Sequence, residues 1–293
     1  MRLATVQLAG AEVAAIALPG GALPIPAINE SLGTRWQTDL LGILTNGEFP
    51  QLRDWLDNQP ELPTTLTDRV IPSAEIRYGP PYRRPRKIWG IGLNYVDHAD
   101  DLAESAPSGE PASFMKPDTT IIGPGEEIRL PEQSKRVTAE AELGVIIGAE
   151  VRDIPESEAL SVVAGFTTVI DMTAEDILRR NPRYLTRSKS FDTFFSFGPE
   201  IITLDEFVTR PEELMNVKVG TWINDLPYRE NVVANMTFSP EFLVSFHSKA
   251  MTLLPGDIIS TGTPGATVIA DSDVVTCRIP GFADLSNPVV RPS

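Results

Sequence analysis

The apolar positions after residue 87 fall into short runs separated by glycine and proline, rather than into long helical stripes. Some runs alternate with polar residues and others are solidly apolar, as is typical of strands buried on one face or on both. The runs cover residues 87–95, 142–151, 162–171, 217–224, 257–262 and 273–279. Spaced strands with long connections predict a β-rich α+β fold with a mixed sheet, not a doubly wound parallel sheet.

The clearest helix in this part of the chain is predicted over residues 239–251. Ser239 can cap its N-terminus, Pro240 suits the first turn, and Glu241 complements the helix dipole. Few other helices interrupt the strand pattern, so the domain is expected to be built mainly from sheet.

The first 80 residues have a different pattern. A pair of short strands with a turn at Gly10 is predicted up to about residue 26. Apolar positions at helical spacing then predict a helix within residues 34–47, and a second short helix is predicted over residues 49–58. The proline-rich, basic stretch 79–87 is interpreted as a linker. We therefore predict a small N-terminal α+β domain over residues 1–80 and a larger domain over residues 81–293.

Charge and composition narrow the expected partners. The chain has 25 Lys and Arg against 40 Asp and Glu, a formal net charge of −15, which disfavours nucleic acid and anionic membrane surfaces. No run of about 18 apolar residues is present to cross a membrane, and the N-terminal pattern, interrupted by Glu12, is unlike a signal peptide. The single cysteine, Cys277, rules out an internal disulfide and indicates a reducing compartment. A cytoplasmic globular protein is expected.

Two carboxylates accompany the apolar run at residues 142–151. Because side chains alternate across a strand, Glu140 and Glu142 point to the same face, with Ala141 on the other. Two like charges that enter a buried strand repel each other and resist desolvation, so they need a counter-charge. Asp171 follows another run and is expected at a strand's end, before a helix that Thr173 can cap.

Three carboxylates together with water form a hard oxygen site that suits Mg²⁺ or Mn²⁺. The cation would supply the missing counter-charge. On spacing alone an alternative stays open, in which Glu140 and Glu142 lie on a solvated edge and Asp171 merely begins a turn.

Several motifs in a fixed order resemble the fumarylacetoacetate hydrolase family over roughly 200 residues, from about residue 87 onward. They include "GIGLNYVDHADDL", "SFMKP", "AEAELGVIIG", "AGFTTVIDMTAED", "RSKSFDTFFSFGPEI" and "LLPGDIISTGTP". The resemblance implies a β-rich C-terminal fold, a small-molecule 2-oxo acid substrate, one Mg²⁺ or Mn²⁺, and a homodimer. It also implies that Glu140, Glu142 and Asp171 are the metal ligands.

The resemblance suggests further site residues. Lys189 matches the family's active-site lysine and is expected to stabilise negative charge on a substrate oxygen. Related hydrolases carry a His–Glu pair on a lid helix, which His98 and Asp101 resemble. Asp101 is one methylene shorter than Glu, so Glu104 is a second candidate partner. The alternative for His98 is a surface position on an ordinary helix.

Candidate substrate contacts come from positions where this chain differs from the family's motifs and from positions where it agrees with them. Many members have arginine where this chain has Glu175. A glutamate in the first turn of a helix could have only a structural role there, because it complements the helix dipole. Arg179, one turn further on, and Arg229 are candidate contacts for a substrate carboxylate in place of that arginine. Thr263 in "STGTP" could donate to the same group, although the turn would also explain the motif.

The predicted function is metal-dependent hydrolysis of a C–C bond in an acylpyruvate-type 2-oxo acid, through an enolate that the metal stabilises. His98 with Asp101 would activate water. An alternative is decarboxylation, isomerisation or hydration on the same chemistry. A non-catalytic binding protein is a third hypothesis, against which the retention of three clustered carboxylates argues.

Overall fold

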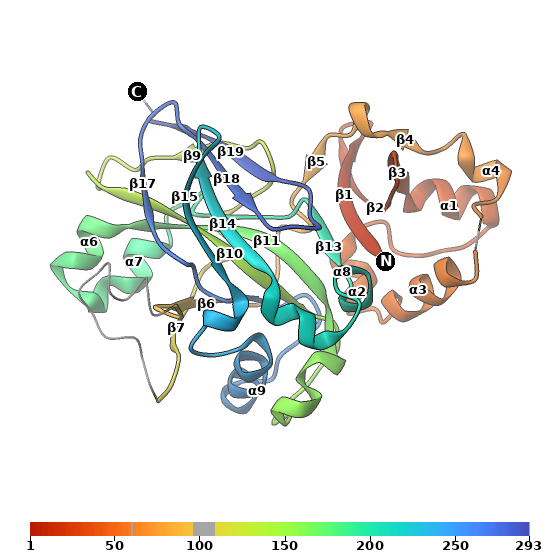
Figure 1. Ribbon diagram of the computed structural model, residues 1–293. Coiled ribbons are helices and arrows are strands. Elements are labelled where there is room, and N and C mark those ends of the chain that lie inside the picture. The colour runs from red at the N-terminus through yellow and green to blue at the C-terminus, as the bar shows by residue number, and fades with distance from the viewer. Residues whose placement is uncertain (60, 96–108, 293) are drawn as a thin grey trace.

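The computed structural model describes residues 1–59, 61–95 and 109–292. Its N-terminal part forms a group of strands and short helices, drawn in red and orange in Figure 1. The strands are β1 (Arg2–Leu8), β2 (Ala11–Leu18), β3 (Gly21–Pro24), β4 (Ile71–Pro72) and β5 (Tyr78–Gly79), and the helices are α1 (Ile25–Leu32), α2 (Leu40–Thr45), α3 (Phe49–Asp57) and α4 (Thr64–Thr67).

The sequence-based prediction for this part was correct at some elements and wrong at others. The turn at Gly10 is present, with a φ of 83° that glycine adopts easily. The expected strand pair is extended by β3 and then by α1, which the apolar pattern did not indicate. Helix α2 is shorter than predicted because Asp39 accepts a hydrogen bond from the Gly42 N–H and begins the helix there.

The rest of the chain supplies most of the strands. They are β6 (Ile88–Gly92), β7 (Ala112–Met115), β8 (Ile121–Ile122), β9 (Ile128–Arg129), β10 (Val137–Ile147), β11 (Val163–Ala174), β12 (Phe195–Phe197), β13 (Glu200–Ile202), β14 (Lys218–Ile223), β15 (Leu226–Val232), β16 (Ile258–Ser260), β17 (Thr267–Ile269), β18 (Val274–Arg278) and β19 (Leu285–Val290). The helices are α6 (Glu175–Arg180), α7 (Leu185–Lys189), α8 (Leu204–Phe207) and α9 (Pro240–Ala250). Helices α6 and α7 lie together at one end of the long strands in Figure 1, and α9 lies near β6.

Two sheets organise these strands. The larger has the order β4-β3-β2-β1-β13-β11-β10-β16-β6-β7, and β5, β8, β12 and β17 pair at its sides. The smaller has the order β15-β14-β18-β19-β9. Both parallel and antiparallel pairs occur, so the predicted α+β class with mixed sheets is confirmed.

The N-terminal strands continue the larger sheet. Strand β1 pairs antiparallel with β13, with Leu3 opposite Ile201. The predicted linker is buried at its start, where Gly79 pairs with Thr5 and Tyr82 is enclosed. The boundary at residue 80 stays a prediction, but the two parts share one sheet.

Strand β10 is buried along its whole length because both of its faces are covered. Ala139, Ala141 and Leu143 face the main hydrophobic core, which also contains Val219 and Val275 of the smaller sheet. The Ala141 N–H donates to Thr221 Oγ1 of β14 at 3.1 Å. One face of β10 therefore packs on the second sheet, and Glu140 and Glu142 take the opposite face.

Candidate active site

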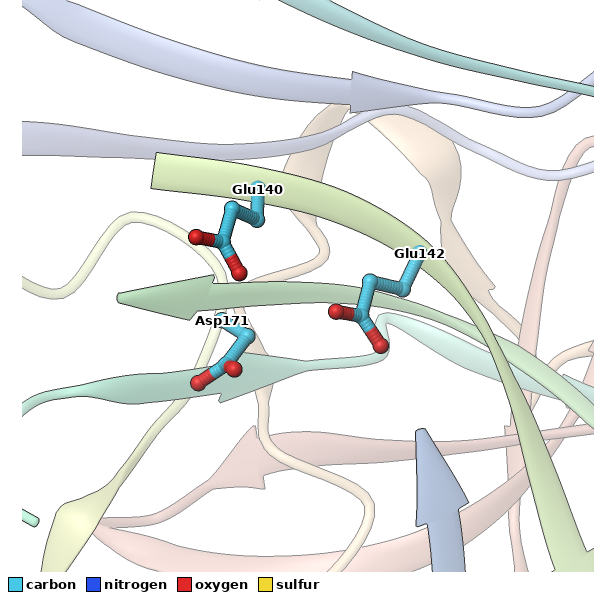
Figure 2. Close-up of side chains that lie close together, drawn as sticks. All are labelled: Glu140, Glu142 and Asp171. Carbon is cyan, nitrogen blue, oxygen red and sulfur yellow. The ribbon is translucent and has the colours of Figure 1, made fainter. Parts of the chain in front are cut away.

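Three carboxylates converge from β10 and β11 (Figure 2). Glu140 lies directly opposite Asp171 in the antiparallel register, and Glu142 follows two residues later on the same face of β10. One ligand atom from each residue lies within 4.8 Å of the others. The exposed fractions are 7% for Glu140, 2% for Glu142 and 1% for Asp171, so bulk water contributes little to screening their mutual repulsion.

Two details of the prediction around Asp171 were wrong. Asp171 is not at a strand end, because β11 stays paired with β10 as far as Ala174. Thr173 does not cap the following helix, whose N-cap is Ala174 with no side-chain hydrogen bond. The Thr173 hydroxyl instead donates to Glu140 Oε1 at 3.0 Å. The longer strand thus places Thr173 beside the carboxylates.

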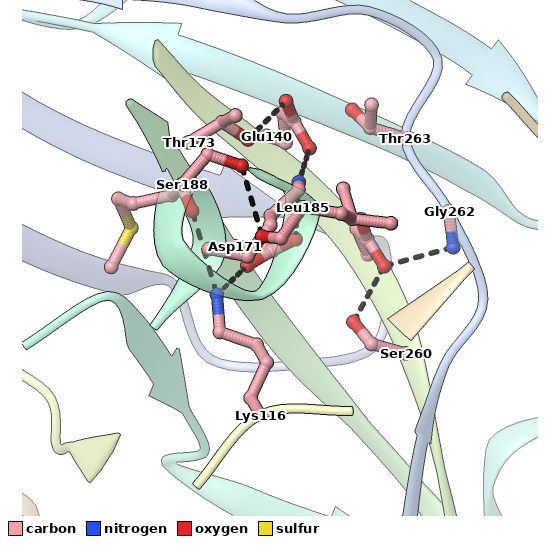
Figure 3. Close-up of polar contacts among 12 residues, drawn as sticks. Lys116, Glu140, Asp171, Thr173, Leu185, Ser188, Ser260, Gly262 and Thr263 are labelled. Atoms are coloured by element: carbon pink, nitrogen blue, oxygen red, sulfur yellow. Dashed lines mark hydrogen bonds and ion pairs between the residues drawn. The ribbon is translucent and has the colours of Figure 1, made fainter. Parts of the chain in front are cut away.

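Two buried lysines supply counter-charge (Figure 3). Lys189, the last residue of α7, donates to Glu140 Oε2 at 2.7 Å and to Asp171 Oδ2 at 2.6 Å. Lys116 donates to the other oxygen of Asp171 and follows strand β7. Burial would lower the pKa of Lys189, but the charges of Asp171, Glu140 and Glu142 outweigh it and raise the pKa above its usual value. Burial lowers the pKa of Lys116 to about 8, although the charge of Asp171 opposes this shift.

Glu142 is held by neutral donors. Its Oε2 accepts hydrogen bonds from the Ser260 hydroxyl and, at 2.8 Å, from the Gly262 N–H. Gly262 has a φ of 98°, and a Cβ there would lie 2.8 Å from the Cβ of Asn94, so both conformation and space require glycine. Burial raises the pKa of Glu142 to about 8, and the charge of Asp171 adds to the effect.

The three carboxylates fit a divalent cation. All three offer hard oxygen ligands, as Mg²⁺ and Mn²⁺ prefer. When all three carboxyl groups are ionised they face two ammonium groups, and one negative charge is then without a full counter-charge among the described residues, in keeping with the raised pKa of Glu142. A cation bound by Glu140, Glu142 and Asp171 would provide that compensation and leave the cluster able to accept an anionic ligand.

A cavity of about 380 Å³ opens beside Glu140 and Lys189. Its wall is largely apolar, and Ile91, Leu93, Phe114, Leu178, Pro182 and Leu185 line it. The polar lining comes from Thr138, Thr173, Thr263, Glu140, Glu175, Arg179 and Lys189. The cavity thus combines a charged end at the carboxylates with an apolar space large enough for a small organic molecule.

Glu175 has more than the helix-dipole role expected for it. Its carboxylate is buried and lines the cavity. It accepts hydrogen bonds from Arg136 Nε and, at 2.6 Å, from Arg179 Nη2. Arg179, predicted as a substrate contact, is therefore at the cavity and is held there by Glu175.

The other predicted substrate contacts differ in position. Thr263 lines the cavity, and its hydroxyl donates to the Gly265 carbonyl oxygen at 3.2 Å. Arg229 is exposed on β15 with its side chain against Gly265, and it is not among the described residues that line the cavity. The loop of Thr263 and Gly265 thus lies between Arg229 and the candidate site.

His98, Asp101 and Glu104 lie outside the described residues, so the predicted water-activating pair stays a prediction. The other histidine, His247, is buried on α9. Its ring contacts Trp89, and Nε2 lies 2.7 Å from the Ser113 hydroxyl.

Sequence reasoning missed two groups at the site, Ser260 and Thr138. Ser260 lies 118 residues from Glu142 in sequence, and no local pattern connects them. Thr138 precedes Glu140 by two residues, and the strand period alone would have placed it on the same face.

Residues 87–290 match the model of the fumarylacetoacetate (FAA) hydrolase C-terminal family. The chain therefore belongs to the fumarylacetoacetate hydrolase family, a family of enzymes that process small molecules, and the resemblance in its motifs is confirmed.

Known relatives differ in their reactions. Oxaloacetate tautomerase FAHD2A, mitochondrial, from Homo sapiens is 36% identical over 230 residues, which are 75% of this chain and 72% of the relative. The structure of maleylpyruvate hydrolase from Sphingobium sp. SYK-6 in complex with manganese(II) ion and pyruvate is similar over 100% of both chains, at a TM-score of 0.79 and 26% identity. The structure of a 5-carboxymethyl-2-hydroxymuconate delta-isomerase from Mycobacterium smegmatis is similar over 100% of both chains, at a TM-score of 0.76 and 29% identity.

Proposed function

We propose that this protein is a divalent-metal-dependent hydrolase that cleaves a C–C bond in an acylpyruvate-type 2-oxo acid. The observation that carries the proposal is the carboxylate cluster of Glu140, Glu142 and Asp171, of which Glu140 lines a cavity with a largely apolar wall. The cluster suits a cation that holds an oxo acid, and the apolar space suits the acyl group beyond it. Manganese and pyruvate in the related maleylpyruvate hydrolase are compatible with this assignment.

The residues around the carboxylate cluster have distinct roles in the proposed reaction. Glu140, Glu142 and Asp171 would hold Mg²⁺ or Mn²⁺, and Thr173, Ser260 and Gly262 fix the orientation of the two glutamates. The bound cation supplies Lewis acidity, which stabilises negative charge that develops on oxygen as the C–C bond breaks. Lys189 lies at the border of the carboxylates and the cavity and brings a positive charge to the same oxygen.

The remaining substrate contacts are proposed from the cavity lining. Arg179 and Thr263 would bind polar groups of the substrate, and Arg229 would act from beyond the Gly265 loop. His98 with Asp101 would activate the attacking water. A homodimer and a cytoplasmic location complete the proposal. No helix among residues 1–59, 61–95 and 109–292 is long and apolar enough to cross a membrane.

Tautomerisation is the second candidate, with decarboxylation or isomerisation on the same chemistry. It is favoured by the 36% identity to the human oxaloacetate tautomerase, and it requires no attacking water. The apolar cavity favours hydrolysis instead, because oxaloacetate carries a second carboxylate and has no apolar group to fill that space.

Product analysis by NMR in D₂O tests these alternatives. Acetylpyruvate, fumarylpyruvate and oxaloacetate would each be incubated with the protein and either Mg²⁺ or EDTA. We expect pyruvate and a free acid from an acylpyruvate, only with Mg²⁺, and a loss of more than about 100-fold in Glu142→Gln. Glu150→Gln, an exposed carboxylate on the loop after β10, is the matched control and should keep full activity.

Other products would change the assignment. Accelerated deuterium incorporation at carbon 3 of oxaloacetate, without cleavage of any compound, would replace hydrolysis by tautomerisation. Pyruvate from oxaloacetate alone would indicate a decarboxylase. Turnover that persists in EDTA and in Glu142→Gln would contradict the metal-dependent proposal altogether.

A further inference from the structure

One face of the β10–β11 pair forms a row of polar side chains that begins at the carboxylates. Glu142, Glu140 and Thr138 alternate along β10, and Thr138 lies opposite Thr173 of β11. Side chains two residues apart on a strand are separated by about 6.6–6.8 Å. Thr138 also lines the cavity, as Glu140 and Thr173 do. The row therefore leads from the proposed metal site into the space proposed for the acyl group.

The Thr138 hydroxyl differs from its neighbour in having no hydrogen-bond partner among the described residues. Thr138 is only 2% exposed, and its Oγ1 makes no hydrogen bond within the part of the chain that the structure describes. The opposite hydroxyl of Thr173 donates to Glu140. Since buried polar groups in folded proteins normally have a hydrogen-bond partner, an unpaired hydroxyl at a cavity wall indicates a ligand contact.

Burial without a partner is not sufficient by itself, as another threonine demonstrates. Thr167 of β11 is also fully buried, and its Oγ1 has no partner among the described residues. Thr167 lies opposite Gly144 and is not among the residues that line the cavity. Thr138 combines the unpaired hydroxyl with a position on the cavity wall beside Glu140, and that combination carries the inference.

We propose that Thr138 Oγ1 donates a hydrogen bond to an oxygen on carbon 4 of the substrate. The inference rests on the proposed function, in which the 2-oxo acid end is held at the carboxylate cluster. Carbon 4 lies two bonds from the 2-oxo carbon. The distance from the 2-oxo carbon through an oxygen on carbon 4 and a hydrogen bond of about 2.8 Å is comparable to the spacing of side chains two residues apart on a strand. The site thus selects 2-oxo acids that carry a carbonyl or hydroxyl group at carbon 4.

The apolar wall defines the rest of the substrate class. The same cavity is lined by Leu178, Pro182 and Leu185, and the buried Glu175 is paired with Arg179. These residues suit an uncharged continuation of the chain past carbon 4. A 4-oxo or 4-hydroxy acid with an apolar end is therefore the expected ligand.

The test compares two ligands that differ by one hydroxyl group. Affinities for 2-oxopentanoate and 4-hydroxy-2-oxopentanoate would be measured by isothermal titration calorimetry with Mn²⁺; neither compound is a β-diketone, so the proposed hydrolysis does not consume them. We expect the wild-type protein to bind the hydroxylated ligand about 10-fold more tightly. Thr138→Val should abolish this preference with little effect on 2-oxopentanoate, and Thr138→Ser should preserve it. Thr167→Val is the matched control and should keep the wild-type preference.

Each other outcome overturns the inference in a distinguishable way. If Thr138→Val keeps the preference, the hydroxyl does not contact the ligand. If it weakens both ligands equally, or if Thr167→Val does the same, the effect is on folding or on the metal site. If the wild-type protein binds neither ligand in the presence of Mn²⁺, the proposed function fails together with the inference.

Discussion

The three carboxylates at the site differ in the partners that hold them. Glu140 and Asp171 form ion pairs with Lys189, and Asp171 also pairs with Lys116. Glu142 is held only by neutral donors among the described residues, the Ser260 hydroxyl and the Gly262 N–H. Its charge is therefore the one that gains most from a bound cation, and its burial is the most unfavourable without one.

Replacing Glu142 by glutamine should separate these two effects. The metal-free Glu142→Gln protein should be about as stable as wild type near pH 7, because the raised pKa of Glu142 keeps its carboxyl group mostly protonated and glutamine retains an oxygen acceptor for Ser260 and Gly262. Mn²⁺ at about 100 times its Kd should stabilise wild type by about 2.7 kcal/mol and Glu142→Gln by much less. Urea denaturation with and without Mn²⁺ measures both quantities.

The matched control for this measurement is Glu150→Gln, which removes an exposed carboxylate on the following loop. It should show the full stabilisation by Mn²⁺. An undiminished effect of Mn²⁺ on Glu142→Gln would mean that the cation binds elsewhere.

How far the site could be predicted depends on the sequence distance between its members. Glu140 and Glu142 lie in one strand, so alternation alone places them on the same face. Asp171 was proposed as the third carboxylate from its place after a run of strand-forming residues, but only the family resemblance favoured that interpretation, since nothing local pairs β10 with β11. Lys116 lies 55 residues from Asp171 in sequence, and its contact with Asp171 depends on the assembled sheet.

At the level of elements, the predictions succeeded where a side chain and its backbone partner are neighbours. The helix predicted over residues 239–251 is α9, and Ser239 accepts a hydrogen bond from the Phe242 N–H at 3.1 Å. The end of β11 was missed because Met172 and Ala174 favour a helix by their own preferences and only Thr173 favours a strand. Pairing with Val137, Thr138 and Ala139 of β10 decides the outcome, and that pairing is not visible in a local pattern.

Removing the cap of α9 should have a measurable cost. Ser239→Ala leaves the Phe242 N–H without its acceptor and is expected to lower the free energy of unfolding by about 1 kcal/mol. Ser239→Asp should retain most of the stability, because its carboxylate can accept the same bond. Ser157→Ala, at an exposed position, is the control for equilibrium urea unfolding. Equal stabilities of all the variants would contradict the capping role.

At the scale of the whole molecule, composition and pattern predicted the fold class but not the connection between its parts. The β-rich pattern and the resemblance indicated the mixed sheets correctly. The joining of the N-terminal strands to the same sheet depends on β1 pairing with β13, across about 200 residues. One of the two large cores accordingly combines Leu3 and Ile16 with Val169, Phe195 and Ile258, so both parts of the chain contribute to a common interior.

The single cysteine provides a probe of the other large core, which lies between β10 and the smaller sheet. Cys277 lies in β18 with no exposed surface, and burial raises the pKa of its thiol to about 12. The native thiol is thus protonated and inaccessible near neutral pH, and a thiol reagent should reach it only after the protein opens. Ellman's reagent should then react slowly in native buffer, and stoichiometrically and rapidly in guanidinium chloride.

The pH and metal dependence of this labelling should follow from the opened state. The rate should rise about tenfold per pH unit up to the ordinary thiol pKa of about 8.5 and then level off, rather than continue to rise towards pH 12. Mn²⁺ at about 100 times its Kd should slow labelling about 100-fold if opening is global and disrupts the metal site. The same Mn²⁺ concentration should leave the rate in Glu142→Gln nearly unchanged. Fast labelling of the folded protein, or a rate insensitive to Mn²⁺ in the wild type, would show that β18 opens independently of the carboxylate cluster.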